Sequence, residues 1–154
     1  MRFKQSSLPR LALLAAACVL LAFATVAAQA KDLKFEALLV WATNAEKSPD
    51  PNHKPIESDV REKLSELPLK WKNYFQVTNK SLSLPKGGVV EVALSEKCKS
   101  SVKDIDGKNV EVALIGKGDS VLKRTQALPK GEMLVLGGNA PNSTGWLVVL
   151  KRIE

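Results

Sequence analysis

The single histidine of the chain, His53, has to take part in any Ser/His/Asp or Cys/His catalytic arrangement. General acid–base catalysis needs an imidazole that a partner orients in a site shielded from water. His53 instead lies in a polar, proline-rich segment, residues 50–55, whose sequence provides neither feature. We therefore expect His53 to be a solvated loop residue, with a binding or catalytic role as the alternative.

The sequence contains no pattern typical of a metal site or of a phosphate-binding glycine loop. Zinc sites use several His and Cys ligands at suitable spacing, and this chain has one His and two Cys. Residues 104–109 (DIDGKN) begin like a calcium-binding loop, but Ile115 stands where that loop needs its closing Glu. The Asp-Gly pair at 106–107 predicts a hairpin turn there. We therefore expect no cofactor and no bound metal.

Aromatic residues provide the one pattern that suggests binding. Trp71 and Tyr74, flanked by Lys70 and Lys72, suit a platform for a sugar ring, a peptide or a partner protein. The alternative is that Trp71 packs a helix onto a sheet while the other two tryptophans fill the core. Large aromatics dominate core burial, which favours the core role. Trp71 and Tyr74 join His53 as candidate binding residues, and we assign no catalytic residue.

The chain has two cysteines, Cys18 and Cys98. Cys98 lies between Lys97 and Lys99, and neighbouring cations are expected to lower the pKa of its thiol. A lone cysteine nevertheless acts more often as a small hydrophobic residue than as a nucleophile. Cys18 belongs to an N-terminal segment that we expect to be removed, so no intramolecular disulfide is predicted.

That N-terminal segment, residues 1–30, has the pattern of a secretory signal peptide. A basic start precedes the uncharged residues 11–30, which end in the small-x-small pattern Ala28-Gln29-Ala30. We expect export by the general secretory route, cleavage after Ala30, and a periplasmic or extracellular location. The alternative is an uncleaved N-terminal membrane anchor, because about 20 apolar residues can span a bilayer. After cleavage the protein is not expected to be an integral membrane protein.

Removal of residues 1–30 lowers the formal net charge from +7 to +4, because the segment holds three basic residues and no acid. The remaining lysines are spread along the chain, whereas nucleic-acid binding requires clustered positive charge. The composition therefore argues against a nucleic-acid partner.

Three segments precede the β-rich part of the chain. In residues 34–42 every second side chain is apolar, and the side chains between them are partly apolar as well. This pattern predicts a strand covered on both sides. Residues 43–57 are a long polar loop with three prolines. Residues 59–67 carry an apolar stripe and acidic residues near their start, which predicts a short amphipathic helix with Ser58 as its N-cap.

From residue 71 onward, short apolar runs alternate with turn signals. The expected strands are 72–84, 89–95, 100–105, 109–116, 119–128, 132–137 and 145–153, with a loop over residues 137–145. A change of apolar parity within the first run predicts a β-bulge near residues 79–80. VEVAL and LPKG each occur twice, without a fixed period. We expect a mainly β fold, an antiparallel β-sandwich or partly open barrel of seven to eight strands with one short helix, in which residues 31–70 and 71–154 pack as one domain.

The function expected from these features is non-catalytic. We predict an exported interaction or structural module of the cell envelope or extracellular space, with a protein partner bound through the loop at 43–57 or through edge strands. The alternative is a binder of small ligands or carbohydrates that uses surface aromatics. A second alternative is a hydrolase that depends on His53 or Cys98. The oligomeric state is left open.

Overall fold

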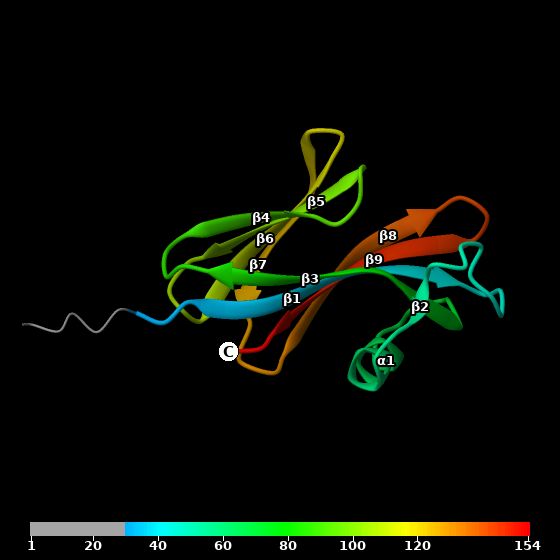
Figure 1. The fold of residues 1–154 in the computed structure, drawn as a ribbon, viewed down its shortest axis with the longest axis horizontal. Helices are drawn as coiled ribbons and strands as arrows, with labels where there is room; N and C mark the ends of the chain where they lie inside the picture. Colours follow the sequence, from blue (N-terminus) through cyan, green and yellow to red (C-terminus); the bar gives the residue numbers. More distant parts are fainter. Residues whose placement is uncertain (1–29) are drawn as a thin grey trace, which may run out of the picture.

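Alternating apolar residues produce a β-rich fold in the computed structural model, which describes residues 30–154 (Figure 1). The elements of this part of the chain are, in order, β1 (Leu33–Thr43), β2 (Lys54–Pro55), α1 (Ser58–Ser65), β3 (Asn73–Leu84), β4 (Val89–Ala93), β5 (Cys98–Asp104), β6 (Asn109–Gly116), β7 (Asp119–Ala127), β8 (Met133–Ala140) and β9 (Thr144–Arg152). Most of the expected signal peptide, including Cys18, lies outside the described residues.

The strands form two antiparallel sheets that face each other. Sheet A has the order β2-β3-β1-β9-β8, and sheet B has the order β4-β5-β6-β7. The sheets do not close into a barrel, which confirms the sandwich alternative of the sequence prediction. The additional strand is β2, whose two residues are too few to produce a detectable pattern.

The central strands of sheet A are buried on both faces. One face of β1 and β9 contributes Phe35 and Leu150 to the core between the sheets. The other face contributes Leu38 and Val149 to a second core, which helix α1 covers. The expectation that residues 34–42 form a strand covered on both sides is therefore confirmed.

Helix α1 packs on sheet A through Val60 and Leu64, which are both buried. The predicted N-cap is wrong, because Ser58 is already the first helical residue and the cap position belongs to Glu57, which makes no side-chain capping bond. Instead, Asp59 accepts a hydrogen bond from the N–H of Val60 and forms an ion pair with Lys151 on β9. Among the described residues, no helix is long and apolar enough to cross a membrane.

The two copies of LPKG are the two places where the chain passes between the sheets. Residues 84–87 lead from β3 in sheet A to β4 in sheet B, and residues 128–131 lead from β7 back to β8. In each copy the leucine is buried and the glycine has a positive φ, 69° at Gly87 and 84° at Gly131. Each proline carbonyl accepts a hydrogen bond from the N–H three residues later, so both copies form the same tight turn.

These turns lie at one end of the sandwich, which we call the crossover end. The buried carboxylate of Asp104 accepts hydrogen bonds from the N–H groups of Gly87 and Gly107, each at 2.7 Å. The guanidinium of Arg152 donates to the carbonyls of Gly107 and Leu128. The chain around residues 106–107 forms the predicted hairpin turn between β5 and β6. Side-chain hydrogen bonds therefore tie the two sheets together at this end.

The opposite end, which we call the open end, holds the turns that join β4 to β5, β6 to β7 and β8 to β9. The expected loop at 137–145 is shorter than predicted, because β8 continues to Ala140 and the turn uses Asn142 and Ser143 at positive φ. Gly137 lies within β8, and a Cβ there would overlap the backbone oxygen of Trp146, so this strand position requires glycine.

Candidate ligand-binding cleft

An apolar cleft of about 590 Å³ opens between the two sheets at the open end. Sheet A lines it with Leu39, Trp41, Val77 and Trp146, and sheet B lines it with Cys98, Ile115 and Val121. We call this feature the open-end cleft. Its size and its apolar walls are typical of small-molecule sites in proteins.

The two tryptophans of the cleft are direct neighbours in sheet A. Trp41 on β1 is the register partner of Trp146 on β9. Both lie on the inner face of the sheet, in line with the buried Leu39 and Val148, yet both are only partly buried. Sheet B side chains line the same cleft but leave both indoles partly exposed. The two sheets diverge toward this end of the sandwich (Figure 1). The sequence prediction assigned both residues to the core and missed this partial exposure.

Two β-bulges contribute side chains to the cleft, one from each sheet. Val77 has no register partner on β1, where Leu39 pairs with Thr78 and Val40 with Gln76. Val121 has no register partner on β6, since the pairing passes from Leu122 to Ser120. A bulge changes the direction of a side chain and is frequent beside functional sites. The bulge predicted near residues 79–80 therefore exists, but it lies at Val77.

Cys98 does not have the activated thiol that the neighbouring lysines suggested. Partial burial against the cleft wall raises the pKa of its thiol above the ordinary value. Burial disfavours the thiolate, and it is the cause of the raised pKa. The sequence-based expectation of a lowered pKa is therefore wrong, and the Cys98 side chain serves as a small apolar part of the wall.

Positive charge lies at the rim of the cleft. Lys97 from the turn between β4 and β5 and Lys117 from the turn between β6 and β7 both line it, and both are exposed. No Asp or Glu belongs to the lining. Neither lysine forms an ion pair with another residue of the described part of the chain.

His53 also lines the cleft, contrary to the expectation of a solvated loop residue. Its side chain is only 13% exposed, and its Nδ1 shares a 2.5 Å hydrogen bond with Oγ of Ser48. Its Nε2 lies 3.8 Å from the Asp50 carboxylate, which is too long for the hydrogen bond that orients a catalytic imidazole. These contacts all lie within residues 48–53, and they hold His53 in a folded loop.

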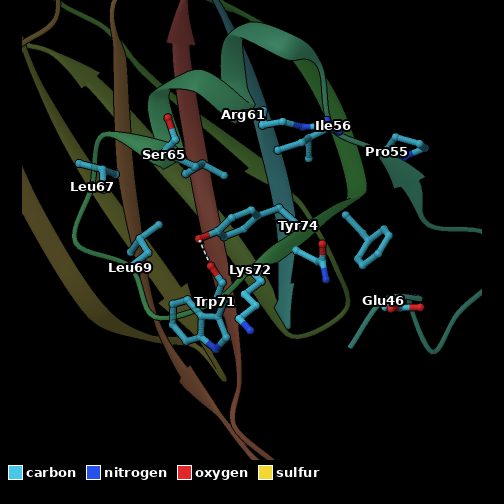
Figure 2. A pocket seen from close by; sticks show the side chains of 13 residues that line it. Glu46, Pro55, Ile56, Arg61, Ser65, Leu67, Leu69, Trp71, Lys72 and Tyr74 are labelled. Atoms are coloured by element: carbon cyan, nitrogen blue, oxygen red, sulfur yellow. Dashed lines mark hydrogen bonds between the residues drawn. The ribbon is translucent and has the colours of Figure 1, made fainter. Parts of the chain in front are cut away.

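The other two candidate binding residues, Trp71 and Tyr74, lie at a separate hollow of about 530 Å³ between the end of α1 and the start of β3 (Figure 2). The phenol of Tyr74 points toward Trp71 and donates a hydrogen bond to its carbonyl oxygen at 3.0 Å. Partial burial raises the pKa of Tyr74. Leu67 and Lys72 line other sides of this hollow, whose surface is mixed in polarity.

Trp71 itself belongs to the second core. It is 9% exposed, and its Nε1 donates a 2.9 Å hydrogen bond to the carbonyl of Ser143. Lys70 lies over the ring at 5.4 Å from its centre. With the ring covered and the N–H bonded internally, little of the indole is left for stacking with a ligand. A binding role for Trp71 and Tyr74 stays a prediction, and the structure places His53 at the other cavity.

Residues 30–154 contain no cluster of three or more His, Cys, Asp or Glu side chains arranged to hold a metal ion. No protein-family model, curated protein or solved structure matches the chain.

Proposed function

We propose that this protein is an exported, non-catalytic binding module whose open-end cleft takes up an apolar ligand. The observation that carries the proposal is the paired, partly exposed Trp41 and Trp146 at the wall of an apolar cavity. Exposing two indoles is unfavourable unless something covers them, and contiguous exposed apolar surface commonly marks an interaction site.

The arrangement of the fold supports this proposal. The crossover end is held together by the hydrogen bonds of Asp104 and Arg152, whereas within residues 30–154 no side-chain hydrogen bond joins the two sheets around the cleft. The chain end at Glu154 pairs with Lys31 at the crossover end, so neither terminus of the described chain blocks the cleft.

The loop expected to contact a partner also reaches this site. Within residues 43–57, His53 contributes to the cleft wall and is held there by Ser48. A ligand in the cleft would therefore contact this loop as well as the two sheets. A protein partner for this loop stays a prediction.

The test compares two exposed valines. Val121 is 58% exposed at the cleft, and Val89 is 56% exposed at the start of β4, at the crossover end. A carboxylate at either position can stay in water, so Val121→Asp and Val89→Asp are both expected to fold, as circular dichroism and thermal unfolding would show. Of the two variants, only Val121→Asp adds a negative charge beside the cleft.

Nile red, an uncharged dye that fluoresces in apolar surroundings, is the probe. We expect wild type and Val89→Asp to bind it equally, and Val121→Asp to bind it about tenfold more weakly, because a charge must stay hydrated. Equal dye binding by all three proteins, or no binding by wild type, would contradict the proposal.

A further inference from the structure

The polar groups of the open-end cleft are distributed unevenly. Most of the wall is formed by apolar side chains such as Trp146 and Ile115, with His53 as a polar member. The lysines, Lys97 and Lys117, come from the turns that border the opening. A ligand that matches this distribution has a long apolar part and a charged part at one end.

The sign of that charge follows from the rim. Glu96 and Asp119, the acidic residues nearest in sequence to the two lysines, are not part of the cleft lining. The lysines are therefore not neutralised by cleft residues, and none of the sheet A residues that line the cleft is charged. Two uncompensated cations beside an apolar surface favour an anion whose remaining part is apolar.

We infer that the ligand of the open-end cleft is a single-chain anionic amphiphile, a long-chain carboxylate whose alkyl chain lies against Trp41 and Trp146 and whose head group meets Lys97 and Lys117. This inference rests on the proposed function of the cleft. A cavity of about 590 Å³ lies within the range that encloses most of a small ligand. The alkyl chain supplies the affinity, and the lysines select the charge of the head group.

The full-length chain offers a built-in reporter for occupancy. In the Cys18→Ser background, Cys98 is the one remaining thiol, and it lines the cleft. An alkyl chain in the cleft should protect Cys98 from a thiol reagent. Displacement of Nile red provides a second, independent measure of the same occupancy.

The experiment compares head groups and chain lengths below the concentration at which the ligands form micelles. Decanoate, dodecanoate and tetradecanoate are compared with dodecanol and with dodecyltrimethylammonium. We expect the affinity for carboxylates to rise about fourfold per added methylene, as for burial of alkyl surface. Dodecanoate should bind more tightly than dodecanol, and the difference should shrink as salt is raised, because salt screens exposed charges.

Variants test the lysines directly. Lys117 has a φ of 52°, so Lys117→Asn removes the charge with a residue that tolerates this conformation. Lys97→Gln with Lys117→Asn should weaken dodecanoate binding about fivefold and leave dodecanol binding unchanged. Lys99→Gln with Lys103→Gln is the matched control. Both of these lysines are exposed on β5, alternate with Cys98 and so point to the opposite face of sheet B.

The outcomes distinguish a failure of this inference from a failure of the proposed function. Equal affinity for dodecanoate and dodecanol, or equal effects of the two lysine pairs, would overturn the inference and leave the apolar cleft intact. Failure of every ligand, including Nile red and dodecanol, would overturn the proposed function as well. Binding only to vesicles that contain anionic lipid, with Cys98 still reactive, would assign the lysines to a membrane surface and would also overturn the inference.

Discussion

The indole of Trp71 occupies the space that a side chain at residue 145 would need. A Cβ on Gly145 would overlap Cζ2 of Trp71 and would lie 2.8 Å from its Cε2. The same indole donates a hydrogen bond to the carbonyl of Ser143, in the turn that precedes β9. Trp71 therefore fastens the turn between β8 and β9 to the segment that follows α1, and the lack of a side chain at Gly145 makes this possible.

Replacing this glycine should be destabilising. In Gly145→Ala the added methyl group must displace the Trp71 ring, which also disturbs the hydrogen bond to Ser143. We expect the free energy of unfolding to fall by about 1–3 kcal/mol, the usual cost of overpacking a core. Urea denaturation followed by tryptophan fluorescence would measure the change.

Gly138→Ala is the matched control, because Gly138 faces Trp146 in the neighbouring strand and a Cβ there would lie 3.6 Å from the nearest ring atom, an ordinary contact. Its free energy of unfolding should stay within about 1 kcal/mol of wild type. Equal losses in Gly138→Ala and Gly145→Ala would show that the overlap with Trp71 is not the cause.

The ion pair between Asp59 and Lys151 holds the first turn of α1 against β9, and it should make stability depend on pH. The hydrogen bond from Lys151 is the main reason that the pKa of Asp59 lies below its ordinary value, and the same bond raises the pKa of Lys151. The folded state therefore binds the Asp59 proton less tightly than the unfolded chain. The pair stabilises the protein at neutral pH, and its contribution is lost as pH falls below about 4 and the carboxylate is protonated.

Asp59→Asn tests this dependence. Because the Asp59 side chain is 41% exposed, solvent screening limits the pair to about 0.5–1 kcal/mol at neutral pH. The difference in unfolding free energy between wild type and Asp59→Asn should narrow as the pH is lowered from 7 to 3, and it should also narrow above the raised pKa of Lys151. A difference that stays constant across the acidic range would exclude this assignment.

Most of the fold follows from local patterns. Strand positions were predictable because turn residues such as those at 106–107 and 129–131 separate runs with period-two alternation. The order of the strands was not predictable, because β1 lies between β3 and β9, and both of these strands are distant from β1 in the sequence. The structure also accounts for the repeated VEVAL. Strands β4 and β6 lie on either side of β5, and both copies place apolar side chains toward sheet A.

The cleft was less predictable than the fold. Trp41 and Trp146 follow the same alternation as buried neighbours, and only the divergence of the sheets distinguishes them. One sequence signal did exist, the parity change in β3 that marks the bulge at Val77. The polar Thr78 and Lys80 that follow Val77 on the inner face of sheet A obscured its position, because an apolar pattern cannot locate a bulge beside polar residues.

A buried hydroxyl on β5 leads to a prediction of the opposite sign. Ser100 is fully buried between Val92 and Leu114, and its Oγ has no hydrogen-bond partner within the described residues. An unpaired buried hydroxyl is unfavourable, so Ser100→Ala should leave the unfolding free energy unchanged or raise it by up to about 1 kcal/mol. Thermal unfolding would measure this change.

Ser101→Ala, on the opposite face of β5, is the control and should have no effect beyond about 0.5 kcal/mol. A clear loss of stability in Ser100→Ala would mean that the hydroxyl is bonded in solution.

The reactivity of Cys98 tests whether burial has a larger effect than the neighbouring lysines on the pKa of its thiol. Because burial raises the pKa of the Cys98 thiol, the reactive thiolate is scarce at neutral pH. In the Cys18→Ser protein, alkylation by iodoacetamide should be slower in the folded than in the denatured chain, and its rate should keep rising above about pH 8.5, the ordinary thiol pKa. A rate that levels off well below that pH would show that Lys97 and Lys99 lower the pKa after all, as the sequence alone suggested.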